Sequence, residues 1–236
     1  GGVVYQIGLD NWWKFNKPVR FYASPFEASS ISTPYISPVL KKYLRLLNDP
    51  FIKNLYDQHI ITDTRGVFQA GIQPLSYVKK NDWMMRLSLE EGGQFLNLVQ
   101  KINAINNLFK NYEQYQYFRA ELDYRKYIPV WRVTNLVGRI NLGAGIPTSK
   151  TNTLLPYEKR FYAGGSTSIR GWHTRDVGPG IFNGFDSTGV RILDRSGDFK
   201  FETNLEYRFP VYSYFNMATF IDAGNVWLWK NDYRRK

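Results

Sequence analysis

Residues 156–172 read PYEKRFYAGGSTSIRGW, and this stretch decides how the rest of the chain is interpreted. It combines glycines, which permit positive φ and close backbone approach, with Arg170 as the single charged residue of residues 161–172. A guanidinium framed in this way suits a buried anion, but a solvated glycine-rich surface turn is the commoner structure for such residues. The neighbouring sequence has to decide between these two alternatives. The residues concerned are Gly164, Gly165, Ile169, Arg170, Gly171 and Trp172.

The composition excludes several classes of protein. The 236 residues contain no cysteine, so disulfides, thiol chemistry and cysteine-ligated metals are ruled out. The two histidines, His59 and His173, are far apart and lack HExxH spacing, so we expect no metal and no cofactor. The formal charge of +11 suits a polyanionic partner such as lipopolysaccharide. The basic residues are scattered, however, and we expect no nucleic acid partner.

The hydropathy pattern does not encode a transmembrane helix, because no run of about 18 apolar residues is present. A membrane location stays open, since barrel strands alternate and leave only a weak hydropathy signal. The chain begins with Gly1 rather than Met and shows no signal peptide. We interpret it as an internal or processed piece of a longer protein.

Several segments alternate between apolar and polar side chains, and a period of two predicts β-strands with two unlike faces. The clearest are residues 117–127, 135–144, 199–209 and 215–223. Residues 128–130 and 208–214 are expected to be short connections, and residues 223–225 to end the last strand. Weaker alternation predicts further strands in residues 3–10, 19–24, 61–72 and 83–90, which gives about eight in all.

Three segments interrupt this pattern. Apolar residues at helical spacing predict short amphipathic helices in residues 37–56 and 95–109, as insertions between strands. Residues 147–198 have no periodicity and contain the quoted stretch, so they are expected to form one long loop. Structureless loops of this length are uncommon and usually functional.

The pattern describes an antiparallel meander with short turns at one end and long loops at the other. In a soluble barrel the apolar face would point inward, whereas in an outer-membrane barrel it meets lipid and the lumen is polar. Charged residues at nearly every second position of a strand favour a water-filled lumen, because a small soluble barrel needs a filled apolar core.

Two segments of the chain resemble the BamA/TamA superfamily of outer-membrane insertases and translocases, also called the bacterial surface antigen family. The first is RFYAGG followed by SIRGW, at residues 160–165 and 168–172, where Ile169-Arg170-Gly171-Trp172 matches a hydrophobic-Arg-Gly-aromatic tetrad. The second comprises NLEYRFP at 204–210 and FIDAGNVW at 220–227. The order and spacing of these motifs are more specific than any one of them. The resemblance covers the second half of the chain well and the first half loosely.

The resemblance implies a fold and a set of contacts. The fold is all-β: a transmembrane antiparallel β-barrel of about sixteen strands, of which this chain would supply part of a single domain. In the family the long loop folds into the barrel, and its arginine pairs with a glutamate and an aspartate on the next two strands. The matching residues here are Arg170, Glu206 and Asp222. The alternation of side chains along each strand supports this pairing, because Glu206 and Asp222 both fall on the polar faces of their strands. We therefore favour the inward-folded loop over the surface turn.

The resemblance also implies a function, which is assembly and insertion of outer-membrane proteins by strand templating and bilayer perturbation. Expected partners are outer-membrane lipid and lipopolysaccharide, unfolded client proteins, upstream POTRA domains and accessory lipoproteins. The POTRA domains and the last strands of a complete member are absent from this sequence. A two-partner secretion pore shares the loop motif and stays as an alternative, as does a porin-like barrel. No catalytic constellation stands out, and we expect no enzyme activity.

Overall fold

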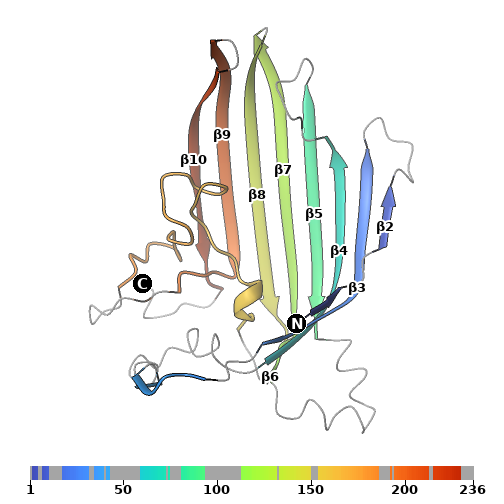
Figure 1. Ribbon diagram of the computed structural model, residues 1–236, viewed down its shortest axis with the longest axis vertical. Helices are drawn as coiled ribbons and strands as arrows, with labels where there is room; N and C mark the ends of the chain where they lie inside the picture. The colour runs from blue at the N-terminus through green and yellow to red at the C-terminus, as the bar shows by residue number, and fades with distance from the viewer. Residues whose placement is uncertain are drawn as a thin grey trace.

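The computed structural model forms one curved antiparallel sheet (Figure 1). It describes residues 2–4, 7–10, 18–31, 35–39, 41–42, 59–72, 74, 81–93, 113–131, 133–149, 154–185, 192, 194–212 and 215–229. The long strands are β3 (Val19–Ile31), β4 (His59–Gly71), β5 (Asp82–Gly92), β7 (Tyr117–Trp131), β8 (Thr134–Pro147), β9 (Phe199–Tyr212) and β10 (Phe215–Trp227). The short strands are β1 (Gly2–Val4), β2 (Ile7–Asp10) and β6 (Glu113–Gln114).

The strand order follows the chain, as expected for a meander. The path through the sheet is β1-β3-β4-β5-β7-β8-β9-β10, with antiparallel pairing throughout. β2 also pairs with β3, and β6 lies parallel to the start of β4. The connections β4–β5, β7–β8 and β9–β10 lie at one end of the sheet, and the long connections lie at the other (Figure 1). The predicted antiparallel all-β fold is confirmed.

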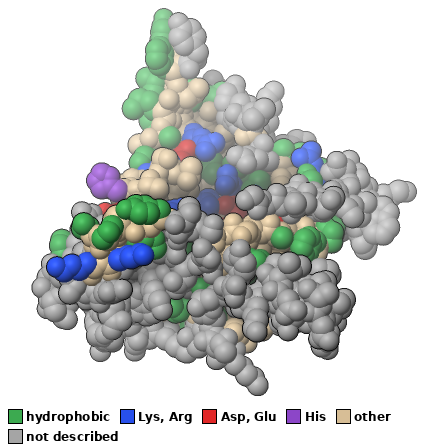
Figure 2. All heavy atoms as spheres, turned by 60° about the horizontal axis from the view of Figure 1, so that its bottom comes forward, with side chains coloured by type: hydrophobic (Ala, Val, Ile, Leu, Met, Phe, Trp, Pro, Cys, Tyr) green, Lys and Arg blue, Asp and Glu red, His purple; other side chains and the backbone are tan. Residues whose placement is uncertain are grey.

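The two faces of the sheet differ as the alternation predicts. Leu89, Phe118 and Ile140 are between 43% and 53% exposed on the outer face. On the inner face, Glu90 and Glu202 are nearly inaccessible, with 4% and 1% of their surface exposed. Viewed from the end with the long connections, charged side chains of both signs lie together in the middle of the molecule (Figure 2). An apolar outer face around a polar interior is typical of a barrel wall that meets lipid.

Several strand boundaries differ from the predictions. Residues 128–130 belong to β7, which continues to Trp131, so the β7–β8 turn lies later than expected. β10 continues through residues 223–225 to Trp227, because Gly224 and Asn225 still pair with β9. In place of one strand over residues 3–10, the described residues form two short strands, β1 and β2, that pair with different parts of β3. Proline and glycine therefore do not end these strands, since one partner strand still satisfies the backbone.

The predicted helical insertions fall mostly outside the described residues. In the first, Pro38, Val39, Lys41 and Lys42 are helical, and the Lys41 amide donates to the Ser37 carbonyl over 2.9 Å. The second, residues 95–109, lies wholly outside them. The described part of the chain contains no helix that is long and apolar enough to span a membrane.

Candidate functional site

The connection between β8 and β9, residues 148–198, is called the inner loop here. No strand is assigned within its described residues, which contain one turn of 3₁₀ helix, η1 (Tyr157–Lys159). The inner loop turns back on itself through two isolated bridges, Phe161 to Gly197 and Ala163 to Val177. It lies across β8, β9 and β10 near the long-connection end (Figure 1).

Arg170 lies at the tip of the inner loop and contacts both acids that sequence reasoning assigned to it. Its Nε and Nη2 donate to the two carboxylate oxygens of Asp222, each over 2.8 Å. Its backbone amide donates to Asp222 over 3.0 Å, and Nη1 donates to Glu206 over 2.5 Å. We call Arg170, Glu206 and Asp222 the tip site. It joins the inner loop to both β9 and β10.

The tip site is electrostatically strong because it is largely shielded from solvent. The side chains are 24% exposed for Arg170, 17% for Glu206 and 4% for Asp222. The guanidinium also lies 3.7 Å from the ring centroid of Phe220. Its hydrogen bonds to Asp222, and then to Glu206, raise the pKa of Arg170 further above its ordinary range. Arg170 is therefore a permanent cation between two acids, bidentate toward one of them.

The other motif residues have unequal roles. Gly164 and Gly165 have φ of 101° and 106°, which L side chains rarely adopt. Ile169 is buried in an apolar cluster of the inner loop and β10. Gly171 has no positive φ, and an added Cβ would meet nothing within 4 Å, so the expected backbone role of this glycine is not observed. Trp172 is 57% exposed.

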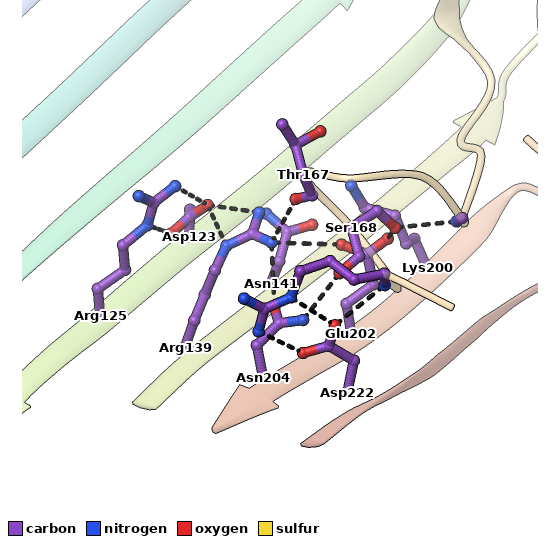
Figure 3. Close-up of polar contacts among 12 residues, drawn as sticks. Asp123, Arg125, Arg139, Asn141, Thr167, Ser168, Lys200, Glu202, Asn204 and Asp222 are labelled. Carbon is purple, nitrogen blue, oxygen red and sulfur yellow. Dashed lines mark hydrogen bonds and ion pairs between the residues drawn. The ribbon is translucent and has the colours of Figure 1, made fainter. Parts of the chain in front are cut away.

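A second layer of polar contacts surrounds the tip site, and sequence reasoning missed it (Figure 3). Ser168 accepts from the Gly164 amide over 2.9 Å and is hydrogen-bonded to the buried Glu202. The Asn204 amide donates to the Ser168 carbonyl over 2.8 Å. Arg139 donates to the Thr167 carbonyl over 3.2 Å. The inner loop backbone is thus held by side chains from β8 and β9 as well as by Arg170.

Strand parity could have found part of this layer. Arg139, Glu202 and Asn204 alternate on the polar faces of β8 and β9, as Glu206 does on β9. Arg139 also pairs with Asp123 of β7 over 2.8 Å, which extends the network along the wall. Which of these side chains reach the loop depends on its path, and residues 147–198 have no local periodicity from which that path could be predicted.

Glycines on the inner face of β8 leave room for side chains of the inner loop to pack against the strand. A Cβ added at Gly143 would lie 2.4 Å from the ring of Phe161, and one at Gly145 would lie 2.6 Å from Leu155. Phe161 is 2% exposed, and the guanidinium of Arg119 lies 4.4 Å from its ring centroid. The Gly-Ala-Gly sequence at residues 143–145 therefore allows loop side chains to lie directly on the strand.

We expect Gly143→Ala to lower the free energy of unfolding by about 1–3 kcal/mol, because the methyl group overpacks against Phe161. Gly138→Ala is the matched control in β8, since a Cβ there meets nothing within 4 Å. Denaturant unfolding in lipid vesicles would measure both variants. Equal stability of the two would show that the Phe161 contact is not tight.

A cavity of about 230 Å³ lies between the tip of the inner loop and the wall. Its lining includes the charged residues Arg125, Arg139, Arg170, Arg208 and Glu206. Among the described residues, no group of three or more His, Asp or Glu side chains is arranged to hold a metal ion. The arrangement offers hydrogen-bond donors and fixed charges.

A curved antiparallel sheet, apolar outside and covered inside by a returning loop, defines the class of outer-membrane-type β-barrels. The chain belongs to the Omp85 superfamily, because the Omp85 superfamily domain matches residues 91–235. This confirms the resemblance to the BamA/TamA superfamily, in its barrel portion.

Two relatives agree with this assignment. Outer membrane protein assembly factor BamA of Neisseria meningitidis serogroup B is 28% identical over 119 residues, which are 48% of this chain and 14% of that protein. The crystal structure of BamA from Haemophilus ducreyi lacking POTRA domains 1–3 is similar with a TM-score of 0.60 and 15% identity. That similarity, which shows the fold, covers 96% of this chain and 41% of the other. The chain thus spans less than half the length of either relative.

Proposed function

We propose that this chain is the membrane-embedded part of a protein that assembles and inserts outer-membrane proteins. The observation that carries the proposal is the tip site, in which Arg170 joins the inner loop to Glu206 and Asp222 on adjacent strands. Membership of the Omp85 superfamily and similarity to a protein named as an assembly factor support it.

The proposed mechanism requires no bond-making chemistry. The inner loop, fixed inside the barrel, keeps the wall strands in register while a client strand pairs at an edge and the surrounding lipid is disturbed. The partners would be unfolded outer-membrane proteins, lipid and lipopolysaccharide, together with POTRA domains and lipoproteins. Membership of the Omp85 superfamily supports a location in the bacterial outer membrane, and the proposal includes a complete barrel of about sixteen strands.

The direct experiment uses the full-length protein in lipid vesicles. An unfolded outer-membrane protein is added, and its folding is followed by the mobility shift that folded barrels show on unheated gels. We expect faster folding than in empty vesicles or in vesicles that carry an unrelated barrel of similar size. Folding no faster than in those controls, together with steady ion conductance, would contradict the proposal and favour a porin. Export of an added polypeptide without insertion would favour the two-partner secretion pore.

A further inference from the structure

Three consecutive charged residues, Glu158, Lys159 and Arg160, lie in the first part of residues 154–185, the longest described stretch of the inner loop. Glu158 and Lys159 lie in η1, where three residues per turn send successive side chains in different directions. Glu158 pairs with His59 of β4 over 3.2 Å. Arg160 has an inaccessible side chain and pairs with Asp194 over 3.1 Å, which closes the base of the loop on itself. The Lys159 side chain points in a third direction, toward the inner face of the sheet.

Lys159 lies between two buried carboxylates. Its Nζ is 2.7 Å from Asp63 of β4 and 2.6 Å from Glu90 of β5. Both acid side chains are 2% exposed, and that of Lys159 is 17% exposed. The Tyr117 hydroxyl donates to Glu90 over 2.6 Å, and the Arg119 guanidinium lies 3.9 Å from it. We call Lys159, Asp63 and Glu90 the base site.

The positive charge of Lys159 offsets the repulsion between Asp63 and Glu90. Two carboxylates that are close together and shielded from water repel each other unless a cation lies between them. Burial lowers the pKa of Lys159, but attraction to Glu90 and hydrogen bonds to both acids outweigh it and raise the pKa overall. Lys159 therefore remains an ammonium ion at every physiological pH, and its pairing does not depend on proton uptake.

The base site and the tip site hold the inner loop to different parts of the wall. Asp63 and Glu90 belong to β4 and β5, whereas Glu206 and Asp222 belong to β9 and β10. β7 and β8 separate the two pairs in the sheet. The base site is close to the long-connection end, because Glu90 lies two residues before the end of β5. The tip site lies deeper, at the middle of β9.

We propose that Lys159 is a second positioning residue of the inner loop, which joins β4 and β5 to the loop as Arg170 joins β9 and β10. The segment from Lys159 to Arg170 then spans the inner face of the sheet as a brace that is fixed at the base site and at the tip site. Loss of either contact loosens that end alone, and loss of both loosens both ends, while the contacts of Glu158, Thr167 and Ser168 with the sheet are retained. The functional meaning of this brace rests on the insertase activity proposed above, but the brace itself does not.

Hydrogen exchange of the full-length protein in lipid tests the proposal. In Lys159→Met we expect amides of residues 155–163 to exchange at least about tenfold faster, while residues 164–172 stay near the parent. Arg170→Ala should give the reverse pattern, and the double variant should raise exchange in both segments. Lys159→Arg should restore protection, because it keeps a charge within reach of both acids.

Two comparisons keep the test decisive. Lys126→Met removes the same charge from the outer face of β7 and should leave loop exchange unchanged. If Lys159→Met does not fold, the pair Asp63→Asn with Glu90→Gln tests the same site with the lysine retained. Unchanged exchange of residues 155–163 in the folded variant, or in that pair, would overturn the proposal. If exchange changes while client proteins are still inserted at the parent's rate, the brace exists but the proposed insertion activity does not depend on it.

Discussion

Arg170→Ala is expected to release the tip of the inner loop and to lower the free energy of unfolding by about 3 kcal/mol. The guanidinium holds Asp222, which is 4% exposed, and Glu206 together. Without it, two largely buried carboxylates lose their shared counter-ion, and the loss of one partner of a buried pair costs more than the pair contributes. The figure lies at the low end of the range for buried pairs because the Arg170 side chain is 24% exposed.

Two variants separate this effect from a general loss of charge. Arg170→Lys keeps the charge but cannot make the bidentate contact with Asp222, so we expect an intermediate loss. Arg175→Gln removes an exposed arginine that stacks on Tyr162 and pairs with no carboxylate among the described residues. It should behave as the parent does. Denaturant unfolding in lipid and trypsin cleavage of the loop measure the effect, and a parent-like Arg170→Ala would show that the tip site does not hold the loop.

The sheet could be predicted from the sequence because the alternation is a local signal. Segments such as 117–127 and 199–209 show their two faces residue by residue, and each one lies within an observed strand. Strand ends were less predictable. Pro129 and Gly224 are residues that usually end strands, yet β7 and β10 continue past them because a neighbouring strand is already in place.

The contacts of the inner loop were only partly predictable. The family resemblance and strand parity pointed to Glu206 and Asp222, and Arg170 contacts both. Nothing in the local pattern pointed from Lys159 to Asp63 and Glu90, because these residues are far apart in the chain and meet only through the path of the loop. Pairings that depend on an aperiodic segment need the three-dimensional structure.

Gly164→Ala is expected to be among the most damaging single changes in the inner loop, although it adds only one methyl group. Gly164 has a φ of 101°, which an alanine adopts only with strain of about 1–3 kcal/mol. The added Cβ would also lie 2.5 Å from the backbone oxygen of His173. Because the obstacle is backbone rather than the end of a flexible side chain, the turn itself must move. We expect a total loss of roughly 3 kcal/mol or more.

Gly171→Ala is the matched control for that change, because it lies next to Arg170 in the same motif. Its φ is not positive, and a Cβ there would meet nothing within 4 Å, so we expect stability within about 0.5 kcal/mol of the parent. Unfolding in lipid and hydrogen exchange of residues 164–172 would compare the two. Movement at Gly164 also displaces Ser168, whose hydroxyl accepts from the Gly164 amide and contacts Glu202. A Gly164→Ala variant as stable as Gly171→Ala would mean that the inner loop tip is not fixed by its backbone conformation.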